Sequence, residues 1–278
     1  MTALRTWHGG RTSAGAAMIR GSFVLAWCAV LLSARSALAR LALRNEATSD
    51  AARHASLAAS TPATTSTDVS RATPSTPPAL TIARLQYDGG GDWYANPSSL
   101  PNLLAAIRER TSLKVDKTEA RVRLTDDKLW DYPFLHVTGH GNIKFSDEEV
   151  VRLREYLERG GFLHVSDNYG IDESFRREIK RVFPDRPLID VPLTHPVYHI
   201  IYDFPKGLPK IHEHDGKPAR GFGIFIGDRL AVFYDWQCDL GNGWEDTEVY
   251  HDPPELHEAA LRMGVNLFVY AITSRPIP

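Results

Sequence analysis

The chain has 278 residues, of which 43% are hydrophobic and 24% are charged. These proportions are typical of a globular protein, since disordered chains have fewer apolar residues and multi-span membrane proteins have many more. Lys and Arg number 32 against 34 Asp and Glu, but eight Arg and only three acids precede Leu80, so the rest of the chain is acidic. An acidic domain disfavours nucleic acid as a partner, because nucleic-acid binders need a basic face.

The first 39 residues are predicted to be a secretory signal peptide. Residues 21–32 form an apolar run without a charge, arginines precede this run, and the small residues of the segment 36–39 follow it. This order is typical of a signal cleaved after Ala39, and the run is shorter than the ~20 apolar residues that span a bilayer. We therefore expect an exported protein, periplasmic or extracellular, without a membrane span after cleavage. An uncleaved N-terminal anchor is the alternative.

Residues 40–79 are rich in Ala, Ser, Thr and Pro and contain no aromatic residue. Such a segment has little to bury, so we expect a disordered linker. A single α/β domain is expected over residues 80–275. Cleavage of the signal would leave Cys238 as the only cysteine, so the domain must be stable through its core rather than through a disulfide.

Strands and helices alternate from Leu80 onwards. The pattern predicts strands over 80–87, 119–124, 134–137 and 162–165, and helices over 99–111, 146–160 and about 173–183. The second helix is expected to begin at a capping box formed by Ser146 and Glu149 and to end at two glycines. This alternation with short loops predicts a doubly wound, mostly parallel sheet.

The C-terminal part changes character. Residues 223–226 and 229–234 flank the dipeptide Gly227-Asp228, which suits a tight β-hairpin. The last predicted helix places apolar residues from Leu256 to Ala271 on one face and should close the sheet. The predicted fold class is therefore α/β, a doubly wound, mostly parallel sheet with a C-terminal β-hairpin and a closing helix.

Three glycine-containing segments, 88–94, 138–141 and 167–170, each follow a predicted strand. Ligands of parallel sheets bind at the carboxyl ends of the strands, and glycines let the backbone approach a ligand closely. We therefore expect these segments to line one pocket, although they can also be ordinary turns. The candidate ligand-binding residues are Asp92, Trp93, Tyr94, Gly139, Gly141, Asn168 and Tyr169.

His140 and Asp167 are the candidate catalytic residues. A histidine in a loop at a strand end can act as a general base, and an aspartate can orient it. Nucleophilic catalysis is not favoured, because the sequence has no G-x-S-x-G elbow. An exposed loop histidine without a chemical role is the alternative interpretation of His140.

No metal-ligand set is assigned, because the chain has no C-x-x-C or H-E-x-x-H pattern. His212 and His214 are weak candidates. In an extended backbone they would share one face, and with a distant carboxylate they could hold zinc. A polar loop before the hairpin explains the segment equally well, and no other cofactor is indicated.

Several strings resemble the bacterial family called domain of unknown function 4159, among them YDGGGDWY (87–94), YPFLHVTGHG (132–141) and LPKIHEHDGKP (208–218). The resemblance covers about residues 80–273. It implies an architecture similar to class I glutamine amidotransferases and flavodoxin, without an established activity. The amidotransferase cysteine has no counterpart in this sequence.

Three functions follow as hypotheses. The leading one is an exported domain that binds a small polar molecule or a cell-envelope carbohydrate at the carboxyl ends of the strands. The alternatives are a hydrolase with His140 as general base, with or without a metal held partly by His212 and His214, and a non-catalytic scaffold that packs against an envelope partner.

Overall fold

Short apolar runs form the strands of one seven-stranded sheet in the computed structural model, which describes residues 80–275. The predicted signal peptide and linker (1–79) lie outside the described residues. The strands are β1 (Ile82–Leu85), β2 (Ala120–Val122), β3 (Phe134–Val137), β4 (Phe162–Val165), β5 (Ile189–Asp190), β6 (Phe222–Ile226) and β7 (Arg229–Tyr234). The longer helices are α2 (Ser99–Arg110), α3 (Asp147–Glu158), α4 (Asp172–Val182) and α7 (Pro254–Thr273). The short helices are η1 (Asp127–Asp131), η2 (Pro196–Tyr198), α5 (Leu240–Gly243) and α6 (Thr247–Tyr250).

The strand order is β2-β1-β3-β4-β7-β6-β5. The first five strands in this order pair in parallel, whereas β6 is antiparallel to both of its neighbours. β1, β3 and β4 are buried along their whole length, as continuous apolar strands covered on both faces require. This arrangement confirms the predicted α/β fold class, the mostly parallel sheet and the hairpin of β6 and β7.

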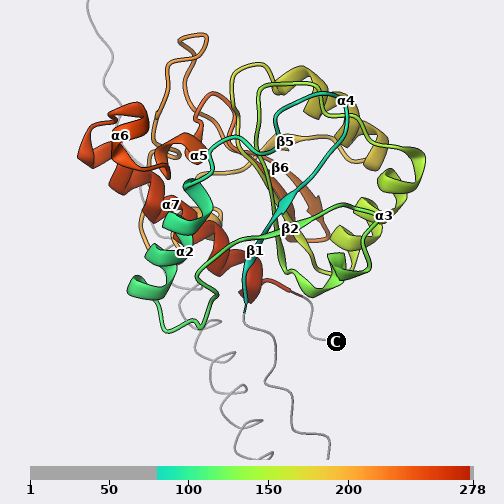
Figure 1. Cartoon of the computed structure of the whole chain (residues 1–278), viewed down its shortest axis with the longest axis horizontal. Coiled ribbons are helices and arrows are strands. Elements are labelled where there is room, and N and C mark those ends of the chain that lie inside the picture. Colours follow the sequence, from blue (N-terminus) through green and yellow to red (C-terminus); the bar gives the residue numbers. More distant parts are fainter. Residues whose placement is uncertain (1–79, 276–278) are drawn as a thin grey trace, which may run out of the picture. The chain divides into compact units, whose positions relative to one another are not determined.

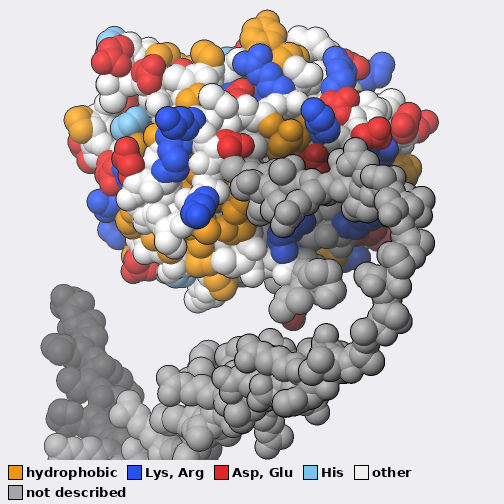
Figure 2. All heavy atoms as spheres, turned by 60° about the horizontal axis from the view of Figure 1, so that its bottom comes forward, with side chains coloured by type: hydrophobic (Ala, Val, Ile, Leu, Met, Phe, Trp, Pro, Cys, Tyr) orange, Lys and Arg blue, Asp and Glu red, His pale blue; other side chains and the backbone are white. Residues whose placement is uncertain are grey.

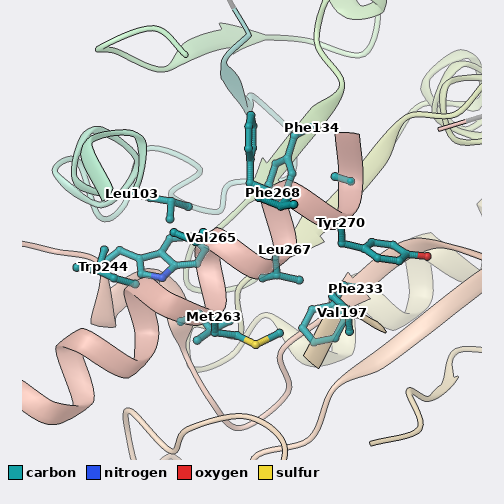
Figure 3. Close-up of a cluster of buried hydrophobic side chains, with 14 of the residues drawn as sticks. Leu103, Phe134, Val197, Phe233, Trp244, Met263, Val265, Leu267, Phe268 and Tyr270 are labelled. Carbon is teal, nitrogen blue, oxygen red and sulfur yellow. The ribbon is translucent and has the colours of Figure 1, made fainter. Parts of the chain in front are cut away.

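Helices cover both faces of the sheet (Figure 1). α2 and α7 pack on one face, where Leu103, Phe134 and Phe268 belong to one buried cluster. Figure 3 shows side chains of α7 within this cluster, together with Trp244 and Phe233. α7 is the predicted closing helix, and its burial explains its largely apolar sequence.

α3 and α4 pack on the opposite face, in a second buried cluster that includes Leu153 and Phe175. The predicted capping box is confirmed: Ser146 Oγ accepts the Glu149 amide, and the Glu149 carboxylate accepts the Ser146 amide. Just after α3, Gly160 has a left-handed backbone with φ of 103°, which glycine adopts without strain. Local sequence signals therefore determine both ends of α3.

Acidic, basic and hydrophobic side chains are interspersed over the face drawn in Figure 2. Among residues 80–275, no helix combines the length and the hydrophobicity that crossing a bilayer requires.

Candidate functional site

The carboxyl ends of β1, β3, β4 and β7 lie at one edge of the sheet, because these four strands are parallel. Hydrogen bonds join the loops that follow them. Tyr87 Oη donates to the Thr138 carbonyl (2.9 Å), and the Asp167 amide donates to Asp235 Oδ1 (2.6 Å). The three segments singled out in the sequence therefore meet at this edge, together with a fourth loop after β7.

Asp92 and His140 form a pair at the outside of this edge. Asp92 Oδ2 lies 2.9 Å from His140 Nδ1, and the other carboxylate oxygen accepts the His140 amide. Partial burial acts to raise the pKa of Asp92, but these bonds from His140 outweigh it and lower that pKa. The His140 side chain is 53% exposed. Trp93 and Tyr94 pack edge-to-face beside this pair.

His212, His214 and Asp239 form a second cluster, which we call the His–His–Asp cluster. One ligand-type atom of each residue lies within 4.8 Å of the other two. Asp239 Oδ2 is 3.4 Å from His214 Nε2 and 3.8 Å from His212 Nδ1. Ligand atoms at about 2.0–2.1 Å from a tetrahedral zinc ion lie about 3.3–3.4 Å apart. Bringing all three atoms to one ion would take side-chain shifts and the displacement of the Asn242 side-chain nitrogen, which lies 2.6 Å from Asp239 Oδ2 and 3.0 Å from His212 Nδ1.

The outer nitrogens of both histidines face carboxylates. His212 Nε2 lies 3.6 Å from Asp252 Oδ1, and His214 Nδ1 lies 3.7 Å from Asp167 Oδ2. Metal-bound histidines commonly donate their second ring N–H to a carboxylate, which fixes the tautomer and turns the other nitrogen to the ion. Both imidazoles of the cluster have this surrounding.

Asn242 contacts two members of the cluster through its side-chain amide. Its Nδ2 donates to Asp239 Oδ2 (2.6 Å) and lies 3.0 Å from His212 Nδ1. Since an amide nitrogen only donates, His212 Nδ1 accepts and the ring proton lies on Nε2. Asn242 Oδ1 accepts bonds from the amides of Asn96 and Asn168. Three loops are therefore tied together at one side chain.

His214 lies between two carboxylates and is almost wholly buried. Burial acts to lower its pKa, but Asp167 and Asp239 outweigh this effect and raise the pKa to about 9. Burial raises the pKa of Asp239, and the two histidines partly oppose this rise. Without a metal, the cluster is thus held by a protonated His214, and a metal ion would replace that proton.

Asp235 connects the cluster to the core of the sheet. It is fully buried, its Oδ2 accepts the Leu240 amide (2.9 Å), and it lies 3.4 Å from His164 Nε2. Burial raises the pKa of Asp235 well above its usual range, and neighbouring Asp239 adds to the rise. Deeper still, Nδ1 of His164 lies 3.0 Å from Nδ1 of His136.

A cavity of about 310 Å³ lies beside His214. Asp167, Tyr169 and Gly170 form part of its wall, so the loop after β4 lines it, whereas no residue of segments 88–94 and 138–141 is among its lining residues. The other lining residues are Asp172, Glu173, His214, Asp215, Lys217, Trp236 and Gln237. A ligand in this cavity would touch a side chain of the His–His–Asp cluster.

The predicted site residues fall into two groups. Asp92 and His140 contact each other at the surface, and they do not line the cavity beside His214. Asp167 contacts Tyr234 and the Gln237 amide instead of His140. The two candidate catalytic residues therefore belong to different parts of the edge.

Gly139, Gly141 and Asn168 connect these parts. Asn168 Oδ1 accepts the Gly139 amide (3.0 Å), and a Cβ on Gly141 would lie 3.2 Å from the Gly170 carbonyl oxygen. Gly139 has φ of 127°, and a Cβ there would lie 2.3 Å from Tyr87 Oη, so this position requires glycine.

The expected reason for the proximity of His212 and His214 is wrong. His214 has a left-handed backbone with φ of 45° in a turn, so the two imidazoles do not share the face of an extended segment. They converge because the turn folds back over Asp239, which caps α5 and itself has φ of 65°.

Sequence reasoning missed Asp239, Asp252, Asp235 and Asn242. Asp235 and Asp239 follow β7, and polar residues after a parallel strand were the signal used for the other three loops. That rule applies to β7 only once its parallel pairing with β4 is known, so both aspartates were missed.

A family model described as "Domain of unknown function (DUF4159)" matches residues 81–272. No curated protein matches the chain.

Proposed function

The chain belongs to the family described as Domain of unknown function (DUF4159), and we propose, from the geometry of its site, that it is a metal-dependent hydrolase of a polar substrate. The His–His–Asp cluster would hold one divalent ion, and the cavity beside His214 would hold the substrate. We also propose that the protein is exported and that it is related to the class I glutamine amidotransferase-like proteins. Both of these parts rest on the sequence alone.

One observation carries the proposal: both histidines present one nitrogen to Asp239 and the other to a separate carboxylate. Metal-bound histidines commonly have this paired arrangement, in which one nitrogen binds the ion and a carboxylate holds the other. Three protein ligands are typical of catalytic zinc sites, which keep a further position for water or substrate. The cavity supplies the space for that position.

A divalent ion held in this way would lower the pKa of a bound water and would act as a Lewis acid on an oxygen of the bond to be hydrolysed. The protein side chains have separate tasks. Asp252 and Asp167 orient His212 and His214, and Asn242 positions the Asp239 carboxylate. Asp167 also lines the cavity, but its two oxygens already accept bonds from the Tyr234 hydroxyl and the Gln237 backbone amide.

Thiol chemistry of the amidotransferase kind has no support at this site. Cys238 is fully buried, its Sγ donates to the Pro209 carbonyl (2.8 Å), and burial raises the pKa of the thiol well above its usual range. A protonated, bonded thiol is a poor nucleophile.

Metal binding is tested on the purified full chain by elemental analysis and by titration calorimetry with zinc and manganese. We expect one ion per chain for the wild type and a rise in Kd of about 100-fold or more for His214→Ala and Asp239→Asn, since each removes one of three ligands. His257→Ala, outside the cluster, should leave the Kd unchanged. Zinc binding at pH 7 should also release the His214 proton, measured as an enthalpy that depends on the buffer. A chain that binds neither metal refutes the proposal.

Hydrolysis is tested with the metal-loaded chain on a panel of ester, amide and glycoside substrates with chromogenic leaving groups. We expect turnover that disappears on chelation, returns with the ion and is absent in Asp239→Asn. A chain that binds metal and ligand but turns over no substrate would instead support the binding domain expected from the sequence, which the cavity also favours. Within residues 80–275, no structural feature specifically favours the scaffold hypothesis.

A further inference from the structure

The cavity beside His214 has two aromatic walls. Tyr169 is 61% exposed, and its ring meets His214 edge-to-face at 5.7 Å. Trp236 forms another wall and is braced edge-to-face by Phe222 at 5.8 Å. A tyrosine ring that is left exposed next to a polar cluster contributes little to the core, but its face is available for stacking with a ligand.

The charged residues on the same wall exclude one class of ligand. Carboxylates outnumber cations: Asp167, Asp172, Glu173 and Asp215 line the cavity, with Lys217 as the one lysine among the lining residues. Three of these carboxylates already face a cation: Asp167 faces His214, Asp172 faces Arg176 and Asp215 faces Lys217. Among the lining side chains, a phosphate, sulfate or carboxylate group would therefore meet no cation without a carboxylate partner. Anionic substrates are therefore disfavoured.

At the Trp236 ring, an organic cation is disfavoured for a different reason. The Lys217 ammonium lies 5.5 Å from the centre of this ring and 3.5 Å from Asp215, so it already occupies the place where a cation would stack. An uncharged ligand needs neither a free cation nor this place.

We infer that the substrate is an uncharged sugar chain, an inference that rests on the proposed function and specifies its substrate class. Hydroxyl groups would donate to Glu173 and Asp215, which are exposed at the cavity, while the C–H face of a sugar ring would stack on Tyr169. A cavity of about 310 Å³ is at the small end for ligand pockets, so it would hold a short part of the chain.

Binding is tested by titration calorimetry on the zinc-loaded full chain. The uncharged probes are the tetrasaccharides of β-1,4-linked N-acetylglucosamine, β-1,4-linked glucose and α-1,4-linked glucose. The charged probes are the tetramers of glucosamine and galacturonate. We expect at least one uncharged probe to bind more tightly than both charged ones. Tyr169→Ala should raise its Kd about three- to tenfold, as the loss of one stacked ring implies, whereas Tyr169→Phe should keep the affinity within about twofold.

Tyr94 provides the matched control, since it is 63% exposed but does not line the cavity. Tyr94→Ala should leave the affinity unchanged. Failure of all uncharged probes to bind at millimolar concentration, tighter binding of a charged probe, or equal losses in Tyr94→Ala and Tyr169→Ala would each overturn the inference. The metal content of the same samples separates the two proposals: a zinc-loaded chain that binds no sugar retains the metal site and refutes only the substrate class.

Discussion

Replacing Asn242 by aspartate should destabilise the metal-free protein much more than the metal-bound one. The Asn242 amide donates to Asp239 Oδ2 over 2.6 Å, and Asn242→Asp puts a carboxylate oxygen in place of that donor. The carbonyl side of the new residue can still accept the bonds from Asn96 and Asn168. The substitution therefore changes one atom at the centre of the cluster and preserves its shape.

The size of the effect follows from the distance between the two groups. Two unit charges 2.6 Å apart repel by about 6 kcal/mol at an effective dielectric constant of about 20. Protonating a carboxyl of ordinary pKa at pH 7 requires only about 4 kcal/mol, so the pair would take up a proton instead. We expect Asn242→Asp to lower the free energy of unfolding by about 4 kcal/mol at pH 7 in chelator, and by less at lower pH.

Zinc should reverse this loss, because the added carboxylate becomes a fourth ligand and its charge faces a cation. Urea denaturation followed by circular dichroism, in EDTA and in excess zinc, measures both states of the full chain. In zinc, the free energy of unfolding of Asn242→Asp should be below that of the wild type by only about 1 kcal/mol or less. A deficit of the same size in both conditions would refute the metal site.

Asn266 supplies the control for burial. It is fully buried on α7, away from the cluster, and its Nδ2 donates to the Tyr202 carbonyl (2.8 Å). Asn266→Asp also places a carboxylate against an acceptor, so it should destabilise the protein. Zinc should leave the loss of unfolding free energy in Asn266→Asp unchanged, because Asn266 contacts none of the proposed metal ligands.

Two further predictions test the core and the loops. Burial lowers the pKa of His164 to about 3, and burial together with the neighbouring His164 lowers the pKa of His136 as well. Both rings are therefore neutral in the folded protein, whereas they are protonated in the unfolded chain below about pH 6.5. The free energy of unfolding should thus fall as the pH drops from about 6.5 towards 3. Urea titrations should show a flatter pH dependence in the double variant His136→Phe/His164→Phe, and an unchanged slope would contradict this origin. Gly139→Ala should reduce stability by about 3 kcal/mol or more, because its Cβ would overlap Tyr87, whereas Gly170→Ala, with φ of 101° and open space, should lose only about 1–2 kcal/mol. Equal losses in thermal denaturation would show that the overlap is relieved elsewhere.

Much of the fold could be predicted because its signals are local. The bounds of β3 and β4 match the predicted strands, and the capping box at Ser146 marks the start of α3. Continuous apolar runs, caps and glycine-containing turns depend on residues close in sequence, so a single chain reveals them.

The candidate site was predicted only in part, because one of its strands pairs over a long distance. β7 was recognised as an arm of a hairpin, but its parallel pairing with β4 depends on contacts such as Leu163 with Val232. No local pattern reports that pairing, so Asp235 and Asp239 were not assigned to the edge. The turn that brings His214 to Asp239 was likewise invisible in the sequence.

The insertion of β7 beside β4 also determines when the proposed metal centre could form. While the chain is being synthesised, β4 is an unpaired edge until β7 has emerged, and Asp239 and Asp252 follow later still. The proposed ion can therefore be acquired only after the chain has been synthesised beyond Asp239 and Asp252. For a chain exported before it folds, loading would then depend on the metal available at its destination rather than on the supply inside the cell that made it.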